Sequence, residues 1–468
     1  MTAIGNSVYV MIAMMALLGA VILGLMAVVL PYWFIIAMMI LPLGLVLAWR
    51  WPEYGVVLVL LLMTGIVPPW FAPSLPLMGG SIKGEDLLFL MLVFTALFRL
   101  WSKRDSWSHI ARYFWPLGLL ALLGLLSMIY ALFYVHNPAK NVLAETEPLL
   151  YWAMLPVVAI VLDSEKKVRH LAVAMSALGL ILAAALSIQS LTGYVLIYGG
   201  RVEIAETLGK HYSGVLRSTA PGIFLLIYGI CFFAGRRLLG VGSRIVGFAA
   251  LAILALGLMF TFGRTLWAST VIGLILMGGM LGLRASLKMA MVGAISLTLV
   301  LVALAVTKPE VFDAIGERVM SVNDEVEQGQ SLAWRYQENA FALRALERSP
   351  LVGVGLGGDY KPVLKESDPE QARFVHSGYL YLVLKLGLLA VVPLVWLYVV
   401  FVRQALAVRK VSGDPRLKAI ALSAFAVALV PLVTAMTRPE WMSPETIASI
   451  AALMGLVVAV ARIHARPS

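Results

Sequence analysis

Cysteine and charged residues are both scarce in this sequence of 468 residues. The single cysteine, Cys231, lies inside an apolar run, so neither an intrachain disulfide framework nor a cysteine-based metal cluster can form. Charged residues make up 13% of the chain, whereas soluble domains contain about 25%. Hydrophobic residues reach 61%, and the mean hydropathy is +0.93. These values exclude a soluble globular protein and a disordered one, and they predict a chain that crosses a membrane many times.

Long apolar runs alternate with short polar segments along the whole chain. We therefore expect an all-α integral membrane protein, a polytopic bundle of about 12–14 transmembrane helices. The first run follows no cationic segment and no small-residue cleavage site, which indicates a retained span. The runs near 85–100 and 148–162 are short and can be re-entrant or interfacial. The runs lie at residues 8–30, 32–48, 55–71, 85–100, 114–135, 148–162, 171–192, 219–235, 245–261, 265–283, 289–306, 376–402, 417–437 and 445–461.

Basic residues concentrate in every second loop between these runs. If the N-terminus is cytoplasmic, the inner loops hold 20 of the 36 basic residues and only five acidic ones. The positive-inside rule then predicts that both termini are cytoplasmic. We expect a large, partly helical periplasmic loop at 309–375, which separates an N-terminal part of the bundle at 1–308 from the C-terminal spans at 376–468.

The long polar segment carries 12 acidic and seven basic residues. Because it is net negative, it offers no basic field for nucleic acid. Residues 331–348 are typical of an amphipathic helix that Pro350 and the following glycines would end. Ser331 is the expected N-cap. The apolar face would comprise Leu332, Tyr336, Leu343 and Leu346.

Arginine, histidine and lysine side chains occur at or within the expected membrane, where such groups are costly and are functional candidates. Arginines on the outer face suit an anionic ligand, since a guanidinium grips phosphate oxygens in a bidentate way. A histidine accepts a proton near neutral pH. Together they fit a membrane-embedded diphosphate with a group to transfer. The candidates are Arg217 before the run at 219, Arg264 in a tight outer turn, His376 at the start of the run after the long loop, and Lys385 nine residues further on.

Each candidate also has a structural interpretation. Arg217 can anchor a helix end, and His376 can cap a helix at the interface. Lys385 can pair with a buried acid or a backbone carbonyl. Arg264 is harder to explain in this way, because an arginine between two apolar runs is disfavoured on the outer side.

Motifs for metal, nucleotide or serine-nucleophile chemistry do not occur in the sequence. It contains no Asp-x-Asp, no P-loop, no dinucleotide fingerprint and no Gly-x-Ser-x-Gly. The carboxylate pairs Glu145 with Glu147 and Asp368 with Glu370 are isolated and more typical of solvated loops. We therefore expect neither a metal site nor a cofactor.

Three short stretches together resemble the O-antigen ligase and polymerase superfamily of bacterial membrane glycosyltransferases. The first runs from Trp334-Arg335 to the Pro-Leu-Val-Gly-Val-Gly turn at 350–355. The second is His376-Ser377, followed after nine residues by Gly387, although Ala390 departs from the usual Gly, Thr or Tyr. The third is Gly263-Arg264 between two spans.

The resemblance implies an inverting, metal-independent transferase at the periplasmic face of the bacterial inner membrane. A ligase moves O-antigen polysaccharide from undecaprenyl diphosphate to the lipid A-core, within lipopolysaccharide biosynthesis. Carried over by position, His376 would be the base, and Arg217 and Arg264 would hold the diphosphate. Arg335, Lys83 and Lys385 are secondary candidates for binding donor or acceptor.

Alternatives remain within and outside this class. A repeat-unit polymerase or a protein-glycosylating relative would use the same donor with another acceptor, although the signature at His376 favours the ligase. A lipid-linked glycan flippase can also have twelve to fourteen spans. Transport, however, needs no polar loop as long as 309–375, and the unusual charges lie at the outer mouth rather than in a central cavity.

Overall fold

The computed structural model describes most of the chain as helices that run through a single bundle. The helical content and the eight described helices that are long and apolar enough to cross a membrane confirm the expected all-α polytopic fold. The runs expected at 8–30 and, except for Gly44 and residues 46–48, at 32–48 lie outside the described residues. These residues are 44, 46–71, 74–77, 80–102, 107–207, 210–321, 330–362, 369–408 and 414–465.

The first half of the described chain contains helices and two short antiparallel hairpins, β1–β2 and β3–β4. A 3-10 turn joins α6 to α7, so that residues 139–161 form one continuous candidate span. The elements are α3 (Pro52–Met63), β1 (Leu75–Leu77), β2 (Gly80–Ile82), α4 (Gly84–Ser102), α5 (Trp107–Ile129), α6 (Ala139–Leu150), α7 (Met154–Val161), α8 (Glu165–Thr192), β3 (Arg201–Thr207) and β4 (Lys210–Thr219).

The second half is helical in its described residues. It includes two helices of the long polar segment, α13 and α15, and the C-terminal helices. The elements are α9 (Ile223–Leu238), α10 (Arg244–Met259), α11 (Arg264–Leu281), α12 (Leu283–Thr307), α13 (Pro309–Met320), α15 (Gln330–Arg348), α16 (Gly378–Leu386), α17 (Val391–Val408), α18 (Pro415–Leu429), α19 (Pro431–Thr434) and α20 (Pro444–Ala465).

The run expected as one span at 376–402 is divided into α16 and α17. The division falls at Gly387, whose φ of 83° is unfavourable for other residues. A Cβ at this position would lie 1.8 Å from the carbonyl oxygen of Leu351. The Leu388 amide also donates to the Pro350 carbonyl, at 2.9 Å. The turn after α15 therefore packs against Gly387 and Leu388, where the expected single helix is interrupted.

Two other expectations about loops are wrong. Glu145 and Glu147 lie within α6 rather than in a solvated loop. Arg284 and Lys288, expected in an inner loop, lie in the first turns of α12, because the chain reverses at Gly282 with a φ of 102°. Hydropathy places the centre of a span well, but polar residues at helix ends blur its boundaries.

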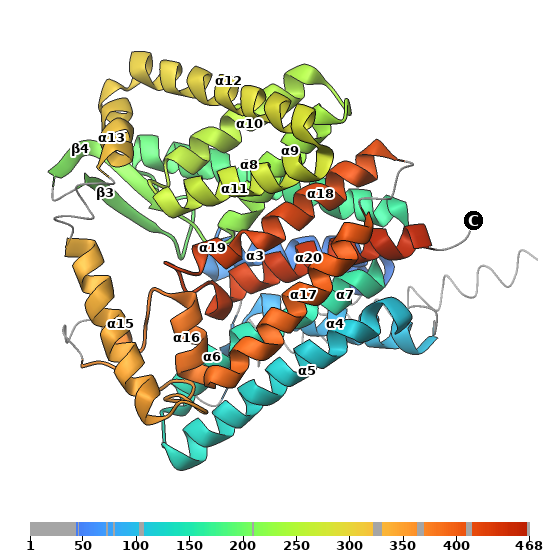
Figure 1. Ribbon diagram of the computed structural model, residues 1–468, viewed down its shortest axis with the longest axis vertical. Helices are drawn as coiled ribbons and strands as arrows, with labels where there is room; N and C mark the ends of the chain where they lie inside the picture. Colours follow the sequence, from blue (N-terminus) through green and yellow to red (C-terminus); the bar gives the residue numbers. More distant parts are fainter. Residues whose placement is uncertain are drawn as a thin grey trace, which may run out of the picture.

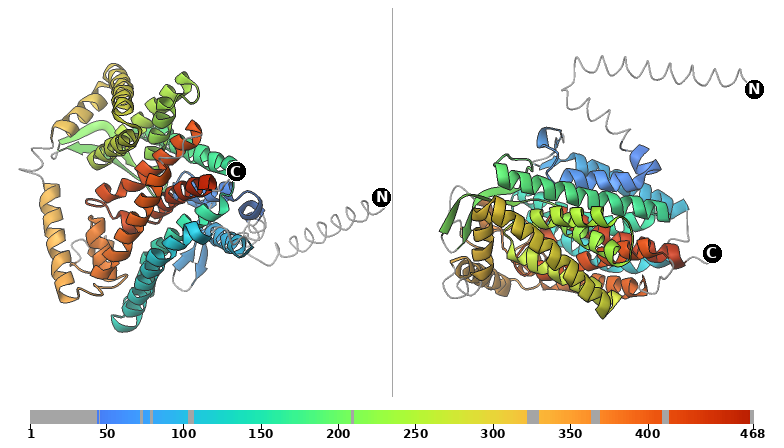
Figure 2. Two further views of the ribbon diagram at one scale, coloured as in Figure 1. Left: turned by 45° about the vertical axis from the view of Figure 1, so that its right-hand side comes forward. Right: turned by 90° about the horizontal axis from the view of Figure 1, so that it is seen from above.

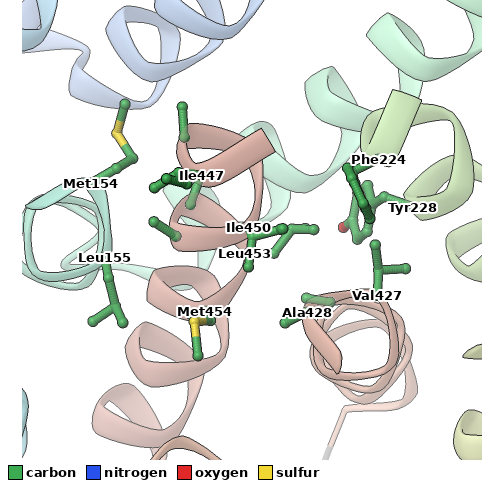
Figure 3. Close-up of a cluster of buried hydrophobic side chains, with 14 of the residues drawn as sticks. Met154, Leu155, Phe224, Tyr228, Val427, Ala428, Ile447, Ile450, Leu453 and Met454 are labelled. Carbon is green, nitrogen blue, oxygen red and sulfur yellow. The ribbon is translucent and has the colours of Figure 1, made fainter. Parts of the chain in front are cut away.

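The core of the bundle is centred on α20. Figure 3 shows side chains of α20, among them Ile447, Leu453 and Met454, between those of α7 on one side and of α9 and α18 on the other. These residues are fully buried. The approach of α20 to α7 is close, since a Cβ at Gly455 would lie 2.6 Å from the carbonyl oxygen of Leu155. Cys231 is buried in α9.

The hairpin β3–β4 and the helices α13 and α15 gather at one end of the bundle, and α20 ends at the other (Figure 1). Both views in Figure 2 agree with this arrangement. The end with the hairpin, α13 and α15 is called the loop end below, and the end at which α20 stops is called the opposite end.

Candidate functional site at the loop end

Arg264 is the first residue of α11, directly after a tight turn from α10. Gly263 is the N-cap residue, and its amide donates to the Thr261 hydroxyl at 3.2 Å. Phe262 has a φ of +48°, which is uncommon for a residue with a side chain and costs about 1 kcal/mol or more. The turn therefore holds Arg264 at the N-terminus of a helix, where the backbone amides also favour an anion.

The sequence predicted Arg217 at the start of a helix. In the structure it lies on the β-hairpin, in strand β4. It pairs in register with Glu203 on β3, and its Nε lies 3.6 Å from a carboxylate oxygen of that residue. The Ser218 amide donates to the Phe260 carbonyl at 2.9 Å. This bond ties the strand that carries Arg217 to the turn that carries Arg264.

Arg318 on α13 is a further arginine of this site that the sequence analysis did not single out. Its guanidinium approaches the Phe262 carbonyl at 3.4 Å and the Glu206 carbonyl at 3.5 Å. Burial and then the positive charges of Arg264, Arg217 and Arg335 lower the pKa of Arg318 to about 10. Arg217, Arg264, Arg318 and Arg335 are called the arginine cluster below. A protein tolerates such repulsion where it binds an anion.

His376 is held by a buried carboxylate from α15. Glu338 Oε2 accepts hydrogen bonds from the His376 backbone amide at 2.9 Å and from its ring Nδ1 at 2.7 Å. Lys361 Nζ donates to the other oxygen, Oε1, at 2.5 Å. The Glu338 side chain is 1% exposed, whereas the His376 ring is 39% exposed. The Phe374 ring and the imidazole form a T-shaped pair, with centroids 5.0 Å apart.

The carboxylate of Glu338 is ionised in this environment. Although burial raises its pKa, hydrogen bonds from His376 and Lys361 outweigh this effect and lower the pKa of Glu338 to about 2. An ionised carboxylate only accepts, so Nδ1 must carry the ring proton that faces it. In the neutral imidazole, Nε2 then has the free lone pair.

The turn at Arg264 and the turn at His376 rest on the same segment, residues 435–440. The hydroxyls of Thr265 and Thr437 are 3.1 Å apart. The amide of Gly378 donates to the Ala435 carbonyl at 2.7 Å. Since Arg335 also precedes Glu338 by one turn of α15, the arginine cluster and His376 together form one candidate site.

Residues 249–395 match the family model described as O-antigen ligase. This segment belongs to the O-antigen ligase superfamily. The match spans the chain from α10 into α17 and contains Arg264, Arg318, Arg335, Glu338 and His376. No curated protein matches the chain.

The loop helix of this segment was only partly predicted from the sequence. The helix at 331–348 is confirmed, but it begins at Gln330, so Ser331 lies inside it rather than at the N-cap. Of the expected apolar face, Tyr336 is 73% exposed and Leu343 is 48% exposed. The face that packs inward carries Glu338, Ala342 and Leu346. The helix docks through the Glu338 carboxylate, whereas a hydropathy pattern places a carboxylate on the solvent-facing side.

The N-cap of α16 is Ser377, whose hydroxyl accepts from the Leu380 amide. His376 therefore does not cap this helix. Its side chain is positioned by Glu338 instead.

The secondary candidates Lys83 and Lys385 both pair with acids of α6. Lys83 Nζ lies 2.9 Å from Glu147 Oε1. Lys385 is fully buried, 3.1 Å from Glu145 Oε2, and donates to the Gly358 carbonyl at 2.7 Å. Glu145 also accepts from the Gly357 amide at 2.6 Å. These contacts fasten the glycine-rich turn after α15 to α6. Asp368, the other candidate carboxylate, lies outside the described residues.

Proposed function

We propose that the protein is an O-antigen ligase. It would move O-antigen polysaccharide from undecaprenyl diphosphate to a hydroxyl of the lipid A-core, at the periplasmic face of the inner membrane. The single observation that carries the proposal is the His376 ring, fixed by Glu338 and placed on the same supporting segment as Arg264. A base for a hydroxyl and a holder for a diphosphate are the two parts that this transfer needs.

The transfer is a single displacement at the anomeric carbon of the donor sugar. The acceptor oxygen attacks this carbon while His376 Nε2 takes the hydroxyl proton. The bond between the anomeric carbon and the phosphate oxygen breaks, and its electron pair leaves with undecaprenyl diphosphate. One displacement inverts the configuration at the carbon. A positioned base contributes about 10²–10⁴-fold to such a step.

The arginine cluster would stabilise the charge that develops on the leaving diphosphate. Each guanidinium keeps its proton and can bond two phosphate oxygens at once. Such preorganised donors lower the barrier most where charge appears in the transition state. Since guanidinium groups provide the positive charge, the step requires neither a metal ion nor another cofactor. Glu338 acts through His376 and is a positioning residue.

The decisive experiment incubates purified protein with undecaprenyl-diphosphate-linked glycan in excess EDTA. Rough lipopolysaccharide is present in one arm and additional donor alone in the other. Glycan transfer to the lipopolysaccharide is expected. Extension of the donor instead would identify a polymerase, and transfer to a protein would identify a protein-glycosylating relative. Movement of the donor across vesicles with no transfer would make the protein a flippase.

His376→Ala tests the base in the same assay. It should abolish transfer and leave donor affinity and thermal stability near those of the wild type. His211→Ala is the matched control, because His211 is an exposed histidine of the same end of the bundle. An active His376→Ala protein would refute the role of the base.

A further inference from the structure

A long stretch of the chain contains cations without any acidic residue. No aspartate or glutamate occurs between Glu206 and Glu310. In this stretch, basic residues gather at one end of α9, α10 and α12. Among the described residues, none of them has a carboxylate within ion-pair distance. They are Arg236, Arg237, Arg244, Arg284 and Lys288.

Three of these cations line a cavity of about 350 Å³. Arg237 comes from the end of α9, Arg244 from the start of α10 and Lys288 from the first turns of α12. The remaining lining is glycine and apolar side chains, with no acidic residue among the described ones. Helix α9 begins directly after β4, and α12 ends directly before α13. Because β4 and α13 lie at the loop end, the cavity lies at the opposite end.

Arg237 is packed against α10 at the cavity wall and has an unsatisfied donor. Its guanidinium lies over the Phe248 ring, 4.9 Å from the centroid. Its aliphatic stem passes so close to α10 that a Cβ at Gly247 would lie 2.8 Å from Arg237 Cδ. Its Nε is buried and has no hydrogen-bond partner within the described part of the chain. A buried donor of this kind costs free energy until an acceptor binds to it.

The apolar half of the lining distinguishes a lipid from a free anion. Met289, Met291 and Val292 of α12 contribute this half. Met291 is 58% exposed, and α12 as a whole is a peripheral helix with few buried residues, so the Met291 edge of the cavity faces the bilayer, whereas Met289 packs into the core. An inorganic anion gains nothing from an apolar wall. A phospholipid places its phosphate at the interface and its acyl chains directly beside it.

We propose that this cavity binds the phosphate of an anionic phospholipid headgroup, with the acyl chains against α12. Arg237, Arg244 and Lys288 would hold the phosphate oxygens. Basic pockets between transmembrane helices bind headgroups in this way. The site lies at the opposite end from His376 and does not depend on the proposed transferase chemistry.

The test compares a zwitterionic lipid with an anionic one. Wild-type protein is reconstituted in phosphatidylcholine nanodiscs with or without phosphatidylglycerol, and bound lipid is measured by native mass spectrometry. Phosphatidylglycerol should be retained in preference to phosphatidylcholine. The double variant Arg237→Gln/Lys288→Gln should lose about 25-fold in this preference, since each cation near the surface contributes about fivefold.

A control variant tests whether the preference depends on the cavity or on positive charge elsewhere in the protein. Arg403→Gln removes an exposed arginine at the end of α17 and should keep the full preference. An equal loss in Arg403→Gln, or an unchanged preference in the double variant, would overturn the proposal.

If the double variant unfolds, Lys288→Gln alone removes an exposed side chain and should reduce the preference about fivefold. If inorganic phosphate raises the thermal stability of the protein as much as phosphatidylglycerol does, a free anion is the occupant and the lipid assignment is wrong.

Discussion

One oxygen of Glu338 accepts two hydrogen bonds from His376, one from the backbone amide and one from ring Nδ1. Together they fix both the start of α16 and the orientation of the imidazole. The other oxygen is held by Lys361, whose ammonium also lies over the Trp334 ring, 5.2 Å from its centroid. The motif at Trp334-Arg335 thus supports the carboxylate that orients the histidine.

Glu338→Gln is expected to slow transfer by about 10²-fold, the lower end of what a positioned base contributes. The amide preserves the shape but carries no charge, so the required tautomer and orientation of His376 are less favoured. Donor KM should stay unchanged. Turnover and donor KM are measured on purified protein.

Glu347→Gln is the control on the same helix, because Glu347 is exposed. It should leave turnover and donor KM as they are. A Glu338→Gln protein with normal turnover would show that the contact is only structural. In the wild type, the pKa of Glu338 is about 2 instead of the ordinary 4.5. Its contribution to stability is therefore complete above pH 4.5 and is lost as the pH falls toward 2.

Arg264→Ala should abolish transfer, and Arg264→Lys should fail nearly as badly. A lysine provides a point charge but not the planar fork that bonds two phosphate oxygens. Each charge-assisted hydrogen bond contributes roughly 1.5–3 kcal/mol. Arg344→Lys is the matched control, since Arg344 is exposed and donates to a carbonyl of its own helix. Full activity of Arg264→Lys would argue against bidentate binding of the diphosphate.

Arg318→Gln should separate stability from binding. The pKa of Arg318 is lowered by burial and by the other members of the arginine cluster, so its charge is destabilising in the absence of an anion. Removing it should raise the thermal unfolding midpoint or leave it unchanged. Affinity for the diphosphate donor should fall about tenfold or more, the equivalent of a lost charged hydrogen bond. A lower midpoint with unchanged affinity would contradict the assignment.

Lys385→Met should destabilise the protein by about 3–5 kcal/mol, because it leaves the buried carboxylate of Glu145 without its cation. The double variant Lys385→Met/Glu145→Gln should recover much of this loss, since the amide oxygen still accepts from the Gly357 amide. Lys140→Met, at an exposed position of α6, should have little effect. Thermal unfolding in detergent gives the comparison. No recovery in the double variant would refute the pair.

Cysteine labelling tests the expected topology in a Cys231→Ser background. A membrane-impermeant maleimide should reach Tyr336→Cys on α15 from the periplasmic side, because this position is 73% exposed. Arg416→Cys, at the exposed start of α18, should react only after the membrane is opened. The reverse pattern would place the candidate site on the cytoplasmic side and would rule out the proposed acceptor.

The sequence alone determined the polytopic helical fold and the helix at 331–348, and it singled out Arg264 as a candidate. Each of these depends on local physics. Apolar runs of sufficient length must form helices in a membrane, and an arginine between two such runs is costly enough to stand out. The family segment was also recognised from short local motifs, and its match at 249–395 agrees with them.

Only the tertiary structure decided which groups complete the site. Glu338 lies 38 residues before His376, and Arg318 meets the arginine cluster from a different helix. In the sequence, both are ordinary charges of a polar loop, where solvated side chains are the rule. Contacts between distant segments also decide three other features. These are the docking of α15 by a carboxylate, the hairpin that carries Arg217 and the break at Gly387. Hydropathy and local spacing do not encode such contacts, because each is favourable only after the other segment is in place.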